Sequence, residues 1–341
     1  MRNKNQIRSF WDKHQSYLKM DKARSLALTS ADNMLMFIEY FQEHHIAWQQ
    51  EAEQFGLPLD LYLHKQWIPI ESFSLFVNAM QLKLRDEALG AKIGFASGPS
   101  FCLYKADDLD FDKTLESLLL SMMNNSAQMS RHVSYWIDVI DKKWCLCHRG
   151  NIKPSFPGYA QIEWFRVSLL ITILRRFLGL NWLPSKMYMM THPHQGGSSE
   201  ALLRPCKLSY SHNFSAIELP LPRDFKPFSY SIKTHKNMEE ITLLAETYAH
   251  LPIFSAEWLA SLFGITRRTL HRYLQEHNCN FREVKEAARY KIAREVLTKT
   301  SDSIETIAFN LGYSDIANFN RAFKSWSGIT AVAYRRKNNS E

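Results

Sequence analysis

The sequence predicts a multidomain protein, with an N-terminal α/β (α+β) domain built on a central mixed sheet and an all-α C-terminal domain. Its 341 residues allow two or three cores of about 150 residues each. Helix and strand patterns alternate up to residue 219, whereas only helix patterns follow residue 237. Residues 255–341 contain 14 Lys and Arg against 9 Asp and Glu, whereas the first 254 residues are nearly neutral. The positive charge therefore belongs mainly to the helical part, where it suits a polyanionic partner.

The composition indicates a globular intracellular protein. Hydrophobic residues make up 45% and charged residues 22%, which excludes wholesale disorder. The cysteines are scattered and odd in number, as expected of reduced thiols: Cys102, Cys145, Cys147, Cys206 and Cys279. The first residues lack the apolar stretch of a secretory signal, and Arg166 and Arg175 interrupt the most apolar helix candidate. We therefore expect a cytoplasmic protein without a membrane partner.

Three prolines between Leu219 and Pro227 mark the end of the first domain, because proline continues neither a helix nor an interior strand. The predicted division is an N-terminal arm (1–27), a first domain (28–227), a linker with a connecting helix (228–254) and a helical domain (255–338). Asn237 is the expected cap of the connecting helix, Met238–His250.

The first domain contains four predicted helices and four predicted strands. Apolar residues at helical spacing predict helices over Ser30–His44, Glu71–Leu84, Asp112–Asn125 and Pro157–Leu178. Strand patterns cover Val133–Ile140, Lys143–His148, Lys186–Thr191 and Ala216–Leu219, with a tight turn at Asp141-Lys142. This mixture predicts the central sheet but leaves its strand order open.

The helical domain contains a near-repeat. Leu259–Thr266 and Ile307–Ser314 share an alanine, a glycine four residues later and a hydroxyl residue two further on. The alanine lets a second helix cross closely, the glycine ends the first helix with a positive φ, and the hydroxyl caps the next helix. The pattern predicts two helix-turn-helix units, whose second helices can enter a major groove. The predicted helix caps are Ser255, Thr266, Ser303 and Ser314.

The second helix of each unit has an apolar face and a polar face. The predicted packing stripes are Leu270, Tyr273 and Leu274 in the first unit and Phe319, Ala322, Phe323 and Trp326 in the second. Arginine and asparagine on the other faces suit guanine and adenine edges. An ordinary solvated face is the alternative, but two units in tandem in the basic part of the chain favour DNA. Between the units, Phe281–Leu297 predicts a rigid helix of roughly 25 Å, which would space the recognition helices for two half-motifs about one DNA turn apart.

The stretch Ser303–Gly328 follows the signature of the AraC/XylS family of bacterial transcription regulators, and the resemblance extends from Phe254 to Arg336. Ala331 departs from the family pattern, which usually has proline there. The resemblance implies a sequence-specific activator that binds double-stranded promoter DNA and contacts RNA polymerase. It also implies base-facing side chains at Arg268, His271 and Arg272 in the first unit and at Ile316, Ala317, Asn318 and Arg321 in the second, with Arg267 and Lys324 toward phosphate.

The first domain is similar, more weakly, to the arabinose-binding-type sensor domain of one branch of this family, over Leu28–Phe225. The similarity is clearest in Ile68–Phe73, Gly90–Gly94, Ala160–Phe165 and Gly179–Pro184. It implies effector sensing, dimerisation or both. We therefore expect a small-molecule effector and a homodimer, with the dimer contact along Gln161–Leu178, and no cofactor.

Other patterns are weaker. Trp144–His148 holds two cysteines and a histidine, with Cys206, His192 and His194 as conceivable further ligands, but the spacing fits no standard zinc site and favours buried thiols. The loop Gly196–Ser199 is predicted to be flexible and lacks the lysine of a phosphate-binding loop. Five aromatic residues are interpreted as core or as the wall of an effector pocket: Tyr135, Trp136, Trp164, Phe165 and Trp182.

Two other functions stay open from the sequence. One is an enzyme domain fused to a DNA-binding module, although no catalytic set and no metal site stand out. The other is an architectural DNA binder without sequence preference.

Overall fold

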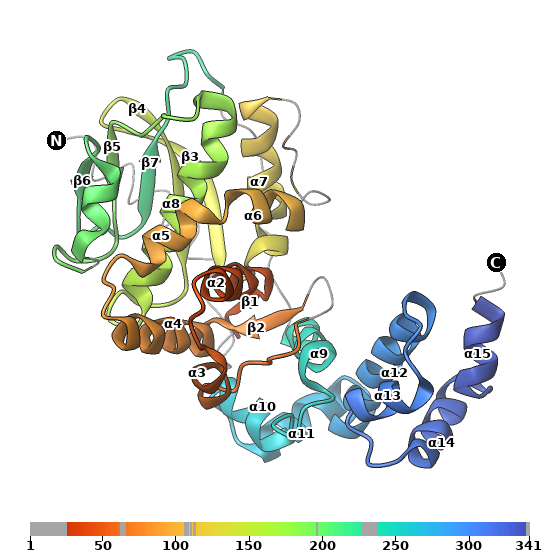
Figure 1. The fold of residues 1–341 in the computed structure, drawn as a ribbon. Coiled ribbons are helices and arrows are strands. Elements are labelled where there is room, and N and C mark those ends of the chain that lie inside the picture. Colours follow the sequence, from red (N-terminus) through yellow and green to blue (C-terminus); the bar gives the residue numbers. More distant parts are fainter. Residues whose placement is uncertain are drawn as a thin grey trace. The chain divides into compact units, whose positions relative to one another are not determined.

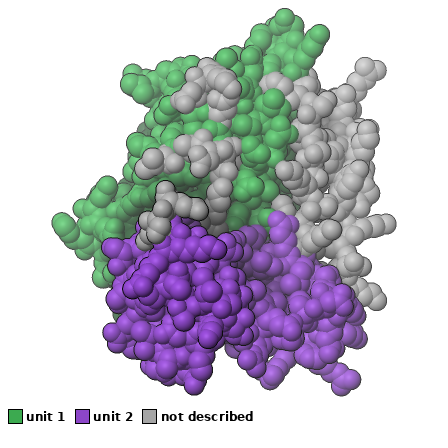
Figure 2. Space-filling view, turned by 90° about the vertical axis from the view of Figure 1, so that its right-hand side faces the viewer, with its two compact units in different colours: residues 1–19, 27–235 green, residues 20–26, 236–341 purple. Residues whose placement is uncertain are grey.

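The computed structural model describes residues 26–61, 66–105, 109, 111, 114–195, 197–226 and 237–338. The chain forms two compact units, which Figure 2 colours separately. Among the described residues, the first unit comprises 27–226 and the second comprises 237–338 with Leu26. Nearly all of the predicted N-terminal arm and the linker stretch 227–236 lie outside the described residues.

The first unit mixes helices and strands (Figure 1). Its helices are α2 (Asp32–Glu43), α3 (Gln49–Gln54), α4 (Ile70–Leu84), α5 (Leu89–Ala96), α6 (Gly98–Tyr104), α7 (Leu115–Met129) and α8 (Tyr159–Leu178), with a 3-10 helix, η1, at Gly197–Leu203. Its strands are β1 (Leu28–Ser30), β2 (Trp67–Pro69), β3 (Val133–Ile140), β4 (Lys143–Gly150), β5 (Lys186–Tyr188), β6 (Lys207–Ser209) and β7 (Ser215–Glu218).

The central sheet has five strands in the order β3-β4-β7-β5-β6. All neighbours are antiparallel except β5 and β6, so the predicted mixed sheet is confirmed. The hairpin β3–β4 turns at Asp141 and Lys142, which both have positive φ, as two-residue hairpin loops require. Strands β1 and β2 form a separate antiparallel pair.

Helix α8 is the buried helix of the first unit and packs against α4, α5 and α6. Glycines allow the close approach of α5: a Cβ on Gly90 would lie 2.0 Å from the backbone oxygen of Gln161, and one on Gly94 would lie 2.3 Å from that of Phe165. The side chain of Gln161 fastens the crossing by accepting from the Gly90 N–H at 2.8 Å. Most of α8 is covered within its own unit, and the dimer contact expected along it stays a prediction.

The second unit is helical throughout its described residues. Its helices are α9 (Asn237–Tyr248), α10 (Ala256–Leu262), α11 (Arg267–Glu276), α12 (Phe281–Lys299), α13 (Ile304–Asn310), α14 (Ile316–Ser327) and α15 (Ala331–Asn338). Helix α9, the predicted connecting helix, packs against α12. The buried Ala331 begins α15, so the absent family proline does not prevent this helix.

Several predictions of local structure differ from the structure. Strand β5 ends at Tyr188 instead of Thr191, because the Glu163 carboxylate accepts the N–H groups of Met190 at 2.7 Å and Thr191 at 2.9 Å. Residues Gly197–Leu203 form a 3-10 helix instead of a flexible loop, and Gly196 lies outside the described residues. In the part of the chain that the structure covers, no helix is long and apolar enough to cross a bilayer.

Candidate nucleic-acid interface

The first helix pair, α10 and α11, is built around a left-handed corner. Ser255 caps α10 by accepting from the Trp258 N–H at 3.1 Å, and Gly264 ends it with a φ of +64°. Thr266 then caps α11 by accepting from the Thr269 N–H at 3.2 Å. The predicted caps Ser255 and Thr266 are therefore confirmed.

The second helix pair, α13 and α14, repeats this corner. Ser303 caps α13 as predicted, and Gly312 ends the pair's first helix with a φ of +75°. The predicted cap Ser314 is wrong, because Asp315 accepts from the Asn318 N–H at 2.7 Å. Ser314 lies one residue too early and instead donates to the Asp315 carboxylate at 3.3 Å. A carboxylate here also suits the positive end of the helix dipole.

Both second helices bury an apolar stripe and expose the predicted DNA-facing side chains. Leu270 and Leu274 of α11 are buried, as are Phe319 and Phe323 of α14. Of the DNA-facing set, all are exposed except Asn318, which is half-buried: Arg267, Arg268, His271, Arg272, Ile316, Ala317, Arg321 and Lys324. These side chains are thus available to a partner, while their contact with DNA stays a prediction.

The arginines of α11 differ in their contacts. Arg267 forms an ion pair with Glu257 of α10 at 2.6 Å, and Arg272 lies 3.9 Å from Glu276 on its own helix. These pairs are exposed, so they contribute little to stability and can exchange for phosphate. Neither Arg268 nor His271 has a hydrogen-bond or ion-pair partner among the described residues.

On α14, three side chains form a hydrogen-bonded row. The Asn318 amide donates to the Asp315 carboxylate and accepts from the Arg321 guanidinium. The backbone N–H of Asn318 holds the pKa of Asp315 below its usual value, so this carboxylate stays ionised. It therefore accepts from both the backbone N–H and the side-chain amide of Asn318. Asp315 was not predicted in this role. Its place directly before Ile316 was a usable signal, since both Ser and Asp are good caps.

Helix α12 joins the two helix pairs. A capping box of Asn280 and Glu283 begins it, and its 19 residues give a length of about 28 Å. Lys285 donates to the backbone oxygen of Phe254 at 3.1 Å, and Arg289 donates to that of Ala249 at 3.0 Å. Near its other end, Leu297 accepts from Arg335 of α15 at 3.3 Å. Helix α12 is therefore anchored near both of its ends by hydrogen bonds to other parts of its unit.

Comparison with known proteins identifies the family of the helical unit. Residues 259–337 match the family model described as a helix-turn-helix domain. The HTH-type transcriptional regulator VqsM of Pseudomonas aeruginosa is 32% identical over 76 residues, which are 22% of this chain and 23% of VqsM. Residues 259–337 are a helix-turn-helix domain of the AraC/XylS family. The AraC/XylS domain includes α11, α12 and α14, and the predicted family is confirmed for this region.

Two further matches extend beyond the AraC/XylS domain. The transcriptional activator RhrA of Rhizobium meliloti is 27% identical over 188 residues, which are 53% of this chain and 57% of RhrA. The transcriptional regulator CdpR of Pseudomonas aeruginosa, a solved structure, aligns with 89% of this chain and 98% of its own at 18% identity, with a TM-score of 0.38. This chain therefore spans between about a quarter and three-fifths of the length of the two curated relatives, VqsM and RhrA.

The weaker sequence patterns have mixed outcomes. Within the described ranges, no group of three or more His, Cys, Asp or Glu side chains could hold a metal ion. Cys145 and Cys147 are fully buried in β4, and burial raises the pKa of Cys145 to about 12. Of the five aromatic residues, Tyr135 and Phe165 line a cavity, whereas Trp136 and Trp164 are buried outside it.

Proposed function

We propose that this protein is a sequence-specific transcriptional regulator that binds double-stranded promoter DNA through α11 and α14. The main support is the repeated arrangement in unit 2. Each helix pair turns on a left-handed glycine, and each second helix exposes arginine beside a buried stripe. Residues 255–338 would form the DNA-binding domain with two helix-turn-helix units, and residues 28–227 the sensing or dimerisation domain.

Each exposed side chain has a proposed role. Arg268, His271 and Arg272 would meet base edges in one major groove, and Ile316, Ala317, Asn318 and Arg321 in the next. Arg267 and Lys324 would contact phosphate and supply affinity without sequence preference.

The remaining partners follow from the same proposal. A small-molecule effector or a homodimer contact in the first domain would control how the helical domain occupies a promoter. Contact with RNA polymerase would make the protein an activator, a role that the name of the relative RhrA also states for that protein. The proposal includes no enzymatic step.

The spacing of the half-motifs tests the role of α12. Genomic footprinting with the full-length protein would give the bound sequence. Inserting five base pairs between its two half-motifs would turn them to opposite sides of the duplex, and we expect binding to be abolished. Unchanged affinity would refute the fixed spacing.

A second experiment separates this function from a nonspecific architectural binder. At about 150 mM salt a nonspecific protein loses most of its affinity and leaves no footprint, whereas a specific regulator keeps one. Lys324→Ala should weaken binding to all sequences alike. It should also reduce the slope of the logarithm of the binding constant against the logarithm of the salt concentration by about one. A Lys324→Ala effect confined to one operator base would contradict the phosphate role.

A further inference from the structure

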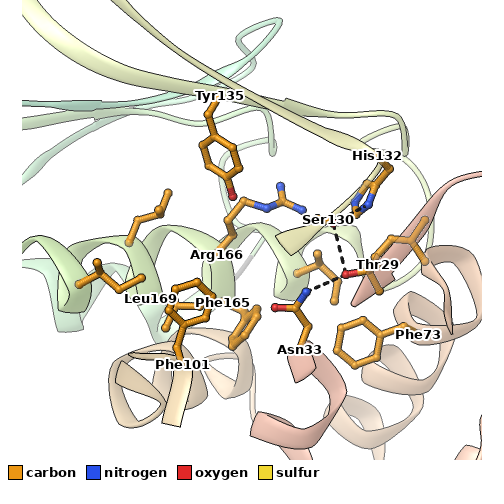
Figure 3. A pocket seen from close by; sticks show the side chains of 14 residues that line it. Thr29, Asn33, Phe73, Phe101, Ser130, His132, Tyr135, Phe165, Arg166 and Leu169 are labelled. Atoms are coloured by element: carbon orange, nitrogen blue, oxygen red, sulfur yellow. Dashed lines mark hydrogen bonds between the residues drawn. The ribbon is translucent and has the colours of Figure 1, made fainter. Parts of the chain in front are cut away.

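The first unit encloses a cavity among its helices and β3. Its volume is about 40 Å³, which is room for about three water molecules. Side chains from α4, α6 and α8 form an apolar wall that includes Phe73, Phe101, Phe165 and Leu169. Arg166 and Tyr135 also line it, and Figure 3 shows the Tyr135 hydroxyl directed toward the Arg166 side chain.

Arg166 has no counterion among the described residues. Glu163, one turn earlier on α8, is occupied by the N–H groups of Met190 and Thr191 and by the Ser215 hydroxyl. Asp32, which begins α2, forms an ion pair with Lys105 at 2.6 Å. A half-buried guanidinium without a partner is costly, so the cavity favours an anion.

The two other titratable groups that line the cavity, His132 and Tyr135, are neutral. Burial and the Arg166 charge lower the pKa of His132 to about 3, and they lower that of the fully buried His148 well below its usual value. Burial raises the pKa of Tyr135, so its hydroxyl stays protonated and can donate a hydrogen bond. The cavity therefore offers a single positive charge with the Tyr135 hydroxyl beside it, which suits a monoanion better than a dianion. The polar side chains of Thr29, Asn33 and Ser130 also line it and hydrogen-bond to one another.

We propose that this cavity binds a small monocarboxylate, whose carboxylate pairs with Arg166 and Tyr135 and whose short aliphatic end lies against Phe101, Phe165 and Leu169. This proposal rests on the sensing role proposed for the first domain and assigns the chemical class of its effector. The volume suits a ligand of about the size of acetate, and propionate and butyrate test how far the apolar end can extend. The apolar wall distinguishes such a ligand from inorganic phosphate, which has no apolar end to bury.

The test is calorimetric titration of the full-length protein, without DNA, in a buffer free of carboxylates. The probes are acetate, propionate and butyrate, each compared with its neutral amide, and inorganic phosphate. We expect at least one carboxylate to bind about tenfold tighter than its amide or phosphate, because only the carboxylate pairs with the guanidinium. Equal binding of amide and carboxylate, preferred binding of phosphate, or no binding of any carboxylate would overturn the proposal.

Variants locate the binding within the cavity. Arg166→Met keeps the length of the side chain but removes its charge, and should weaken carboxylate binding by about tenfold or more. Tyr135→Phe keeps the ring and should weaken it by a few-fold. Arg176→Met, an exposed change on the same helix, should leave binding unaltered. Near-ultraviolet circular dichroism checks that each variant is folded, and a folded Arg166→Met protein with unchanged affinity would refute the site.

The two proposals fail separately. Because the titration contains no DNA, loss of carboxylate binding leaves the footprint as an independent result. A bound carboxylate without any footprint would contradict DNA recognition but keep the chemistry of the cavity.

Discussion

The two helix pairs of the AraC/XylS domain have the same corner but different surroundings. A Cβ on Gly264 would meet nothing within 4 Å, whereas one on Gly312 would lie 2.5 Å from the backbone oxygen of His250 and 3.0 Å from Arg289. The buried stripe of α11 is aliphatic. That of α14 is aromatic, and the Phe323 ring contacts the rings of Tyr290 and Tyr334 of α12 and α15. The first corner therefore depends on its own backbone, and the second on packing against the rest of the domain.

The exposed faces of α11 and α14 also differ in how Arg268 and Arg321 are held. Arg321 is oriented by Asn318, which is itself bound to Asp315, whereas Arg268 has no such partner among the described residues. A side chain that is already oriented loses less conformational entropy on binding. We therefore expect α14 to be the more sequence-specific and α11 the more adaptable of the two helices.

The largest expected effect comes from removing the aromatic core of the second pair. Phe323→Ala should cost about 3–5 kcal/mol, because a fully buried ring with several ring contacts leaves a cavity. Hydrogen exchange of the full-length protein should show lost protection in α14 and α15, with α11 protected as before. Equal loss in both helix pairs would show that they unfold as one unit and remove the contrast.

The corner glycines give the next largest effect. Gly264→Ala should cost about 1–2 kcal/mol, because a side chain disfavours the left-handed conformation. Gly312→Ala should cost more, since its Cβ also meets the His250 carbonyl. Chemical denaturation of the two variants measures the difference. Equal destabilisation of the two variants would mean that the backbone at His250 moves aside for the new Cβ at little cost in free energy.

The arginines test the exposed faces. Arg321→Ala should remove about 1–3 kcal/mol of discrimination at one base position. Arg268→Ala should relax a different position by less, because Arg268 must first be ordered. Selection of bound sequences from a random pool measures both. A larger loss with Arg268→Ala would reverse the assignment of the more specific helix.

The smallest effect concerns Asp315. Asp315→Ser keeps a capping oxygen, so α14 should remain stable, but it removes the carboxylate oxygen that binds the Asn318 amide. We expect a loss of about 0.5–1 kcal/mol in discrimination at the Arg321 position, corresponding to one hydrogen bond. Asp315→Asn is the isosteric companion variant: it keeps the capping oxygen, but its amide nitrogen donates and cannot accept from the Asn318 amide, so it should show the same loss as Asp315→Ser. If all three proteins select the same bases equally well, the row of hydrogen bonds does not orient Arg321.

The length over which each apolar pattern repeats determined how much of the fold could be predicted from the sequence. The hairpin β3–β4 and the helices α4, α8 and α14 are long enough for their apolar pattern to be clear, and their predicted positions agree closely with the structure. Strands β1, β2 and β6 have three residues each, too few for a pattern, and were not predicted. Helices α5 and α6 are short and begin at or near glycines that the close crossing with α8 requires, which hides their helical character.

The candidate site was predictable where it lies on one helix and not where it depends on tertiary contacts. The faces of α11 and α14 follow from spacing alone, so their exposed residues were predicted. Arg166 was noted only as a charge in an apolar helix. Its lack of a counterion depends on Glu163 reaching Met190 and on Asp32 reaching Lys105, contacts between segments far apart in sequence. No local pattern contains that information.

The uninterrupted α12 limits how this protein can evolve new binding sites. Each residue added to or removed from an α-helix turns the rest of the chain by about 100° and shifts it by about 1.5 Å. A one-residue insertion in α12 would therefore turn α14 by about 100° relative to α11 and, under the proposed function, away from the DNA. Under the proposed function, we expect the spacing of the two half-motifs in descendants of this chain to change by large steps in the length of α12 or by changes in the DNA sequence. We do not expect it to change by adding one residue at a time to the helix.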